Sequence, residues 1–170
     1  NFGFYDATVD GGWQVPNEPY TTAEDSEFMW WRARMLGGRT NHWGRYSLRF
    51  SHHDFKGKSR DGLGADWPFE YEDIAPWYDK TEKLVGVCGA NTDHEDMPHS
   101  APGVLQEPPK PRVTELLVAA AAGKEGIRAV PMHRAVLTKS QDIRQKCFYA
   151  TPCGHGCSIG AAFQTTTSLI

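Results

Sequence analysis

The sequence has no excess of basic residues and no long hydrophobic run. Its 18 Lys and Arg residues stand against 21 Asp and Glu residues, which gives a formal net charge of −3. A chain of this charge lacks the basic field that attracts nucleic acid. It also lacks any stretch of about 18 apolar residues, the length that a membrane-spanning helix needs. We therefore expect no nucleic-acid partner and no membrane span.

A dinucleotide fingerprint is also absent, because no Gly-x-Gly-x-x-Gly run occurs in the chain. The chain begins at Asn1 without a signal segment and ends on the apolar pair Leu169 and Ile170. We therefore expect an interior piece of a longer protein. Its 170 residues, 39% of them hydrophobic, are enough for one domain with a sizeable core.

What the sequence does contain is a glycine-rich run from Arg34 to Gly44. Gly37 and Gly38 remove side-chain bulk where a backbone turns sharply or another molecule comes close. Three side chains that can hydrogen-bond to a polar ligand follow, and then a flat apolar one: Thr40, Asn41, His42 and Trp43. The run predicts a ligand-approach loop, and the alternative is an ordinary Gly-Gly turn with a structural Trp behind it.

Alternating residues predict strands on both sides of this loop, near 28–35 and 45–50. A further strand is expected from Arg128 to Thr138, bent or at an edge because Pro131 interrupts it. Together with the helices described next, these segments predict a mixed α/β fold.

Two segments carry helical patterns, near 76–85 and 114–124. In the first, Pro76 suits the first helical position, Asp79 and Lys83 can pair across one turn, and Gly86 suits a left-handed stop. Trp77, Thr81, Leu84 and Val85 follow at helical spacing, so we expect a helix that packs through this face. The second segment is Ala-rich, and we expect Leu116, Leu117 and Ala120 to face inward.

Three of the four cysteines lie close together, in the spacing Cys-x5-Cys-x3-Cys: Cys147, Cys153 and Cys157. Pro and Gly residues between them bend the backbone and leave its N–H groups uncovered, which suits thiolates that converge on one centre. Four interpretations remain open: an iron–sulfur cluster, a zinc site completed by His155, a disulfide, or inert packing thiols. Cys88 stands alone and is expected to be a small buried hydrophobe.

The glycine-rich run and the cysteines together resemble the glucose–methanol–choline (GMC) family of oxidoreductases. The run from Ala33 to Trp43 is similar to the flavin-contacting loop of that family. Later runs resemble its bacterial sugar-dehydrogenase branch: Asp54-Phe55, Asp66-Trp67-Pro68, Tyr71 to Tyr78, and Leu84 to Val87. In that branch, some flavin subunits carry a three-iron, four-sulfur (3Fe–4S) cluster on cysteines spaced like Cys147, Cys153 and Cys157. The resemblance spans about residues 28–170.

The resemblance implies an interior fragment of a two-domain flavoprotein. Residues 1–55 would belong to the FAD-binding domain, 56–145 to the cap on the substrate side, and 146–170 to the cysteine loop and the return to the FAD-binding domain. Gly37, Gly38 and Thr40 would lie along the pyrophosphate and ribityl chain. The residues beside the isoalloxazine would be Asn41, His42, Trp43 and Gly44. For His42 the resemblance leaves a covalent and a non-covalent flavin contact open.

The implied activity is oxidation of the CH–OH group of a sugar, glycoside or polyol, with hydride transfer to flavin N5. Electrons would pass to an external acceptor such as a cytochrome, by way of the cluster on the three cysteines. The sequence departs from the family at Arg39, His42 and Trp43, and no histidine matches the family's catalytic pair. We therefore name no catalytic residue and expect the chain to be inactive alone. The alternative function is a zinc-stabilised binding module without enzymatic activity.

Overall fold

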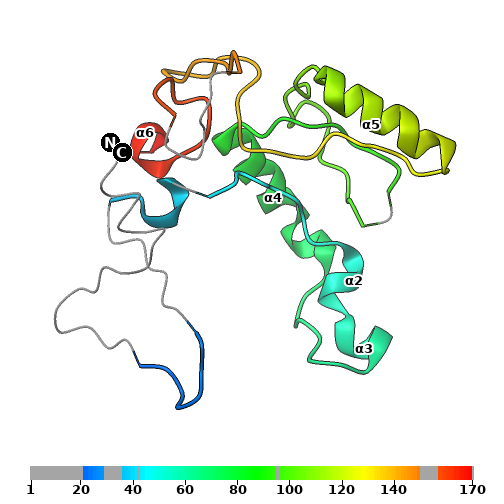
Figure 1. Cartoon of the computed structure of the whole chain (residues 1–170). Coiled ribbons are helices and arrows are strands. Elements are labelled where there is room, and N and C mark those ends of the chain that lie inside the picture. The colour runs from blue at the N-terminus through cyan, green and yellow to red at the C-terminus, as the bar shows by residue number, and fades with distance from the viewer. Residues whose placement is uncertain (1–20, 29–35, 42, 95, 150–156, 170) are drawn as a thin grey trace.

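The computed structural model describes residues 21–28, 36–41, 43–94, 96–149 and 157–169 (Figure 1). The regular elements in these ranges are the 3-10 helix η1 (Gly38–Asn41) and the α-helices α2 (His52–Phe55), α3 (Gly57–Asp61), α4 (Tyr71–Val85), α5 (Val113–Lys124) and α6 (Thr165–Ser168). Extended segments between them meet through isolated β-bridges. The described chain is thus mixed but rich in helix, and none of its helices is long and apolar enough to cross a membrane.

The segment from His133 to Leu137 joins parts of the chain that are far apart in sequence. Arg134 forms bridges with both Cys88 and Tyr46, Val136 pairs with Ala162, and Cys88 also pairs with Gln106. Around these bridges lies the core, which consists of Val87, Ala135 and Phe163, with Trp43, Val85 and Leu105 packed against it. This small core connects η1, the end of α4 and the segment before α6.

The strands expected at 45–50 and 128–138 are wrong as strands, because only single residues of each form bridges. At the first, Arg45 has a φ of 61°, which ends an extended conformation there. Side chains in this segment do alternate between exposed and buried positions, but the apolar ones are outside. Tyr46, Leu48 and Phe50 are exposed, whereas Arg45 and Arg49 are buried. The strand expected at 28–35 lies, after Phe28, outside the described residues.

Helix α4 begins five residues before the expected start, at Tyr71. The Asp73 carboxylate accepts the N–H of Glu70 at 2.9 Å and caps the first turn, so Pro76 lies inside the helix. The predicted stop is confirmed, because Gly86 has a φ of 76° and its N–H reaches the carbonyl of Glu82.

The expected inner face of α4 is wrong. Trp77 is 62% exposed and Leu84 is 56% exposed, whereas Tyr71 and Glu82 are buried. Glu82 is buried because it binds Arg49, through Nε at 2.9 Å and Nη2 at 2.5 Å. Asp79 also binds Arg49 Nη2, at 2.5 Å, so its ion-pair partner is Arg49 and not Lys83.

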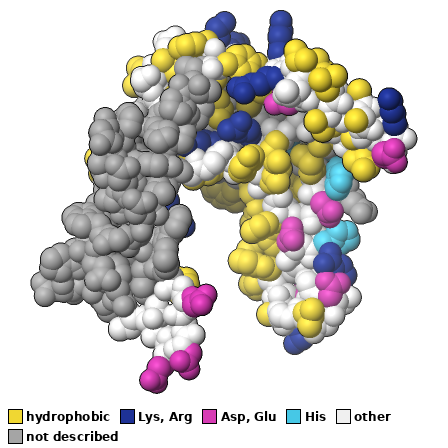
Figure 2. Space-filling model, viewed as in Figure 1, with side chains coloured by type: hydrophobic (Ala, Val, Ile, Leu, Met, Phe, Trp, Pro, Cys, Tyr) yellow, Lys and Arg dark blue, Asp and Glu magenta, His cyan; other side chains and the backbone are white. Residues whose placement is uncertain are grey.

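Helix α5 agrees with the expected 114–124 to within one residue, but its expected inner face is wrong. Leu116 and Leu117 are 54% and 66% exposed, and Ala120 is also exposed. Since α5 is apolar on every side, its sequence contains no polar stripe from which an inner face could be chosen. Lys and Arg side chains gather near the upper edge of the molecule beside this apolar helix (Figure 2).

Candidate functional site

In the glycine-rich loop, η1 lies against α6 (Figure 1). Hydrogen bonds hold the two helices together. Thr40 Oγ1 lies 2.9 Å from Thr165 Oγ1 and accepts the N–H of Thr165 at 3.2 Å. Thr166 Oγ1 donates to Asn41 Oδ1 at 3.0 Å. Two side chains expected at the cofactor, those of Thr40 and Asn41, are therefore engaged with the chain's own C-terminal helix.

The two adjacent glycines have different surroundings. A Cβ on Gly37 would lie 2.8 Å from Thr166 Cγ2 and 2.9 Å from Thr165 Oγ1, and φ at Gly37 is +85°. Gly38 has a φ of +51°, and a Cβ there would have no atom of the described residues within 4 Å. Packing against α6 thus requires glycine at 37, whereas the described residues leave the backbone at 38 open to an approaching molecule.

Trp43 and Gly44 complete the described part of this loop. Trp43 packs against the core, and its Nε1 donates to the carbonyl of Phe163 at 3.4 Å. A Cβ on Gly44 would lie 3.0 Å from the Tyr46 ring. His42, the residue on which the question of a covalent flavin bond depends, lies outside the described residues.

Arg45 supports the loop from inside and was not singled out by the sequence. It is 2% exposed, and its guanidinium donates to the carbonyls of Trp43 at 2.6 Å and Asn41 at 3.1 Å. These bonds hold the backbone after η1 in one conformation. An arginine beside a glycine loop carries no sequence signal of burial, which is why it was missed.

Two of the three predicted metal-binding cysteines lie in the described chain, and both accept a peptide N–H. Tyr149 donates to Cys147 Sγ at 3.2 Å, and Ala162 donates to Cys157 Sγ at 3.4 Å. Both thiols are free, as is that of Cys88. Donors of this kind stabilise anionic sulfur, as at metal-bound thiolates.

Cys153 and His155 lie outside the described residues. No three His, Cys, Asp or Glu side chains converge in the ranges that are described. The trio of Cys147, Cys153 and Cys157 therefore stays a prediction.

The buried Arg144 lies near the Cys157 thiol. Arg144 is 4% exposed and donates to the carbonyls of Gly160 and Val85, each at 2.8 Å. Burial lowers the pKa of Arg144, and its attraction to Cys157 and Asp142 opposes that change. A buried cation with backbone acceptors provides a positive environment for an anionic centre at Cys157.

Cys88 is the small buried hydrophobe that the sequence predicts. It is 1% exposed, and this burial raises the pKa of its thiol despite the nearby Arg134 guanidinium. A buried neutral thiol of this kind has low reactivity.

Comparison with known proteins gives relatives but no match to a family model. Over 159 residues the chain is 30% identical to 6'''-hydroxyparomomycin C oxidase of Streptomyces lividus, covering 89% of this chain and 26% of that protein. Over 134 residues it is 30% identical to the fructose dehydrogenase large subunit of Gluconobacter japonicus, covering 75% and 24%. Over 113 residues it is 31% identical to 2-methyl-1,2-propanediol dehydrogenase of Mycolicibacterium austroafricanum, covering 65% and 20%.

These relatives are oxidases and dehydrogenases, which are oxidoreductases. Within that class, the chain belongs to the glucose–methanol–choline type, which confirms the family predicted from the sequence. The chain spans 20% to 26% of the length of the relatives described above.

Proposed function

We propose that the chain forms part of an FAD-dependent oxidoreductase that oxidises the CH–OH group of a sugar, glycoside or polyol. The observation that carries this proposal is the relationship to an oxidase of 6'''-hydroxyparomomycin C and to dehydrogenases of fructose and of 2-methyl-1,2-propanediol. In the proposed division of the chain, residues 1–55 belong to the FAD-binding domain, 56–145 to the cap, and 146–170 to the cysteine loop.

The flavin contact is proposed for Gly37, Gly38, Thr40, Asn41, His42, Trp43 and Gly44. Bound FAD supplies a hydride acceptor at its N5 atom. The described residues of the loop have two different roles in this contact. The open backbone at Gly38 is the point of close approach, whereas Thr40 and Asn41 hold the loop in shape through their bonds to α6. A loop fixed in this way orients a ligand without ordering itself at each binding event.

The cysteine loop is proposed to hold a 3Fe–4S cluster on Cys147, Cys153 and Cys157. The donor set supports this proposal, since Cys147 and Cys157 each accept a peptide N–H and the buried Arg144 lies near Cys157. An external electron acceptor such as a cytochrome is the proposed partner. Tyr149, whose N–H donates to Cys147, has a φ of 64°. This left-handed conformation is unfavourable for so large a residue.

Cofactor analysis of the intact protein, purified without oxygen, tests these assignments. We expect a flavin absorbance spectrum, iron with acid-labile sulfide, and reduction of an artificial dye when a sugar or polyol is added. Flavin that stays in solution after acid precipitation would rule out a covalent bond to His42. Stoichiometric zinc without colour would contradict the proposal and favour the zinc-stabilised binding module.

A further inference from the structure

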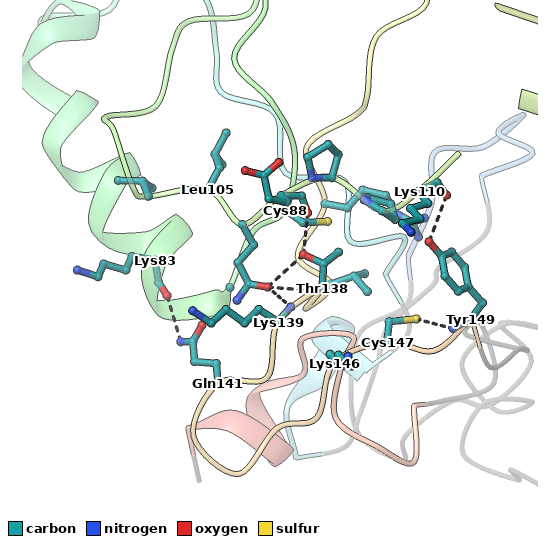
Figure 3. Close-up of a pocket in the computed structure, with 18 of the residues that line it drawn as sticks. Lys83, Cys88, Leu105, Lys110, Thr138, Lys139, Gln141, Lys146, Cys147 and Tyr149 are labelled. Carbon is teal, nitrogen blue, oxygen red and sulfur yellow. Dashed lines mark hydrogen bonds between the residues drawn. The ribbon is translucent and has the colours of Figure 1, made fainter. Parts of the chain in front are cut away.

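A cavity of about 1100 Å³ lies between the chain around 103–112 and the chain around 134–149 (Figure 3). Gln106 joins these two walls, because its Oε1 accepts the N–H of Thr138 at 2.9 Å and of Lys139 at 2.8 Å. Apolar side chains also line it, among them those of Cys88, Leu105 and Val136. Its shape is thus fixed by bonds within the chain, and its volume suits a small molecule.

The lining of the cavity is cationic. Its acidic residues are Glu107, Glu115 and Asp142, and Glu115 already accepts the N–H of Arg112 at 2.6 Å. Five cationic residues line it as well: Lys110, Arg112, Arg134, Lys139 and Lys146. A further lining residue, Lys83, directs its ammonium away from the other labelled side chains (Figure 3).

None of these five cations forms an ion pair with a residue that the structure describes. The ion pairs found in the described ranges lie elsewhere, on Arg49, His52, Lys56 and Arg60. Because the whole chain has a net charge of −3, the positive charge at the cavity is a local concentration. Such a concentration in a concave site attracts anions.

Arg134 is the cation best placed to anchor an anion. Its Nε is buried without a hydrogen-bond acceptor in the described chain, and its guanidinium lies 5.6 Å from the centre of the Tyr46 ring. Arg112 lies over the Tyr149 ring in the same way, at 5.7 Å. Contact with an aromatic face holds a guanidinium plane but leaves its N–H groups available to carboxylate or phosphate oxygens.

We propose that this cavity binds a small molecule with two or more carboxylate or phosphate groups, with Arg134 as its main anchor. The apolar lining would contact the carbon skeleton of the ligand, and the lysines would balance its remaining charge. None of the described flavin-contact residues lines the cavity, and Cys147 is the one described ligand of the proposed cluster that does. The proposed anion contacts are made by other residues, so they do not depend on the proposed function. The ligand would lie beside Cys147 and Tyr149, which line the same cavity.

Calorimetric titration of the intact protein with inorganic pyrophosphate and with citrate tests the proposal and separates phosphate from carboxylate ligands. We expect one or both probes to bind, more weakly as the salt concentration rises. Arg134→Gln should weaken binding about tenfold or more, because a charge-assisted contact is lost. Arg128→Gln is the matched control, since Arg128 is exposed and lies outside the cavity. It should change the affinity less than about twofold.

Lys139→Gln combined with Lys146→Gln gives a second comparison that leaves Arg134 in place, with the exposed Lys124→Gln as its control. Thermal unfolding shows whether each variant folds. Equal losses in Arg128→Gln and Arg134→Gln would overturn the proposal, as they would indicate only general attraction of anions. It would also be overturned if neither probe bound, or if a polyglutamate peptide alone bound, which would make the cavity part of a protein interface.

Discussion

A network of charged and polar side chains connects helix α4 to Arg49, which lies before α2, and to Ser100, which lies after α4. Arg49 is its centre. It binds Glu82 and Asp79 on α4 and the hydroxyl of Tyr71 at 2.9 Å. Ser100 donates to Glu82 Oε2 at 2.7 Å and extends this network to the chain after α4. No sequence pattern predicted it, because its members lie up to 51 residues apart and each is an ordinary charged or polar residue when seen alone.

Glu82→Gln is expected to lower the free energy of unfolding by about 3 kcal/mol, because it removes the buried charge that is paired with Arg49. Glu72→Gln is the control. The Glu72 side chain is 70% exposed and pairs only with His52 in the described chain. Its loss should cost less than about 1 kcal/mol. Urea unfolding measures both values, and similar losses for the two variants would contradict the role given to Arg49.

Asp79 should make the stability of the protein depend on pH. Partial burial acts to raise the pKa of Asp79, but the Arg49 guanidinium and the Ala101 N–H outweigh it and hold this pKa below its ordinary value. Since the folded-state pKa is lowered, the stabilisation is present above the unfolded value of about 3.9. It is lost as the pH falls through the folded-state pKa.

Asp79→Asn is therefore expected to be less stable than the native protein at neutral pH and to lose less stability below about pH 4. Urea unfolding across this pH range measures the difference. The native protein would still respond to acid through Asp61 and Asp66, whose pKa values are also lowered. Parallel curves for the two proteins would contradict the prediction.

At the scale of the elements, the sequence predicted most where local chemistry decides the outcome. The Ala-rich segment set the bounds of α5, and the left-handed requirement at Gly86 set the end of α4. The start of α4 was missed because Pro76 suited a first position, while the cap formed by Glu70 and Asp73 was overlooked. The buried faces of both helices depend on contacts with distant segments, which helical spacing alone does not contain.

Gly86→Ala should destabilise the protein more than a left-handed glycine usually does. A Cβ there would clash with the Leu137 side chain and lie 3.1 Å from Gln141 Oε1, at a φ of +76°. We expect a cost of about 1–2 kcal/mol from the backbone and about 1–3 kcal/mol from overpacking. Gly126→Ala is the control, because its φ is +73° and a Cβ would have no neighbour within 4 Å in the part of the chain that the structure describes. Equal losses by chemical unfolding would show that the clash is relieved at no cost.

At the scale of the whole molecule, the family could be predicted from the sequence, whereas the candidate site stays a prediction. The sequence marked the glycine loop and the cysteines, and the family resemblance that joined them is confirmed. It did not predict that Thr40 and Asn41 bind α6, since this contact joins residues 125 positions apart. Nor did it mark Arg45 and Arg144, which support the glycine loop and the cysteine loop from inside.

The central claim is that a flavin lies against the open backbone at Gly38, and the flavin content of Gly38→Ala compared with Gly62→Ala tests it most directly. Both glycines have a positive φ, and a Cβ on either would have no atom of the described chain within 4 Å. Both variants should therefore lose similar stability in thermal unfolding of the flavin-free protein. We predict that Gly38→Ala purifies with much less flavin than Gly62→Ala. Equal flavin content in the two variants would contradict the claim.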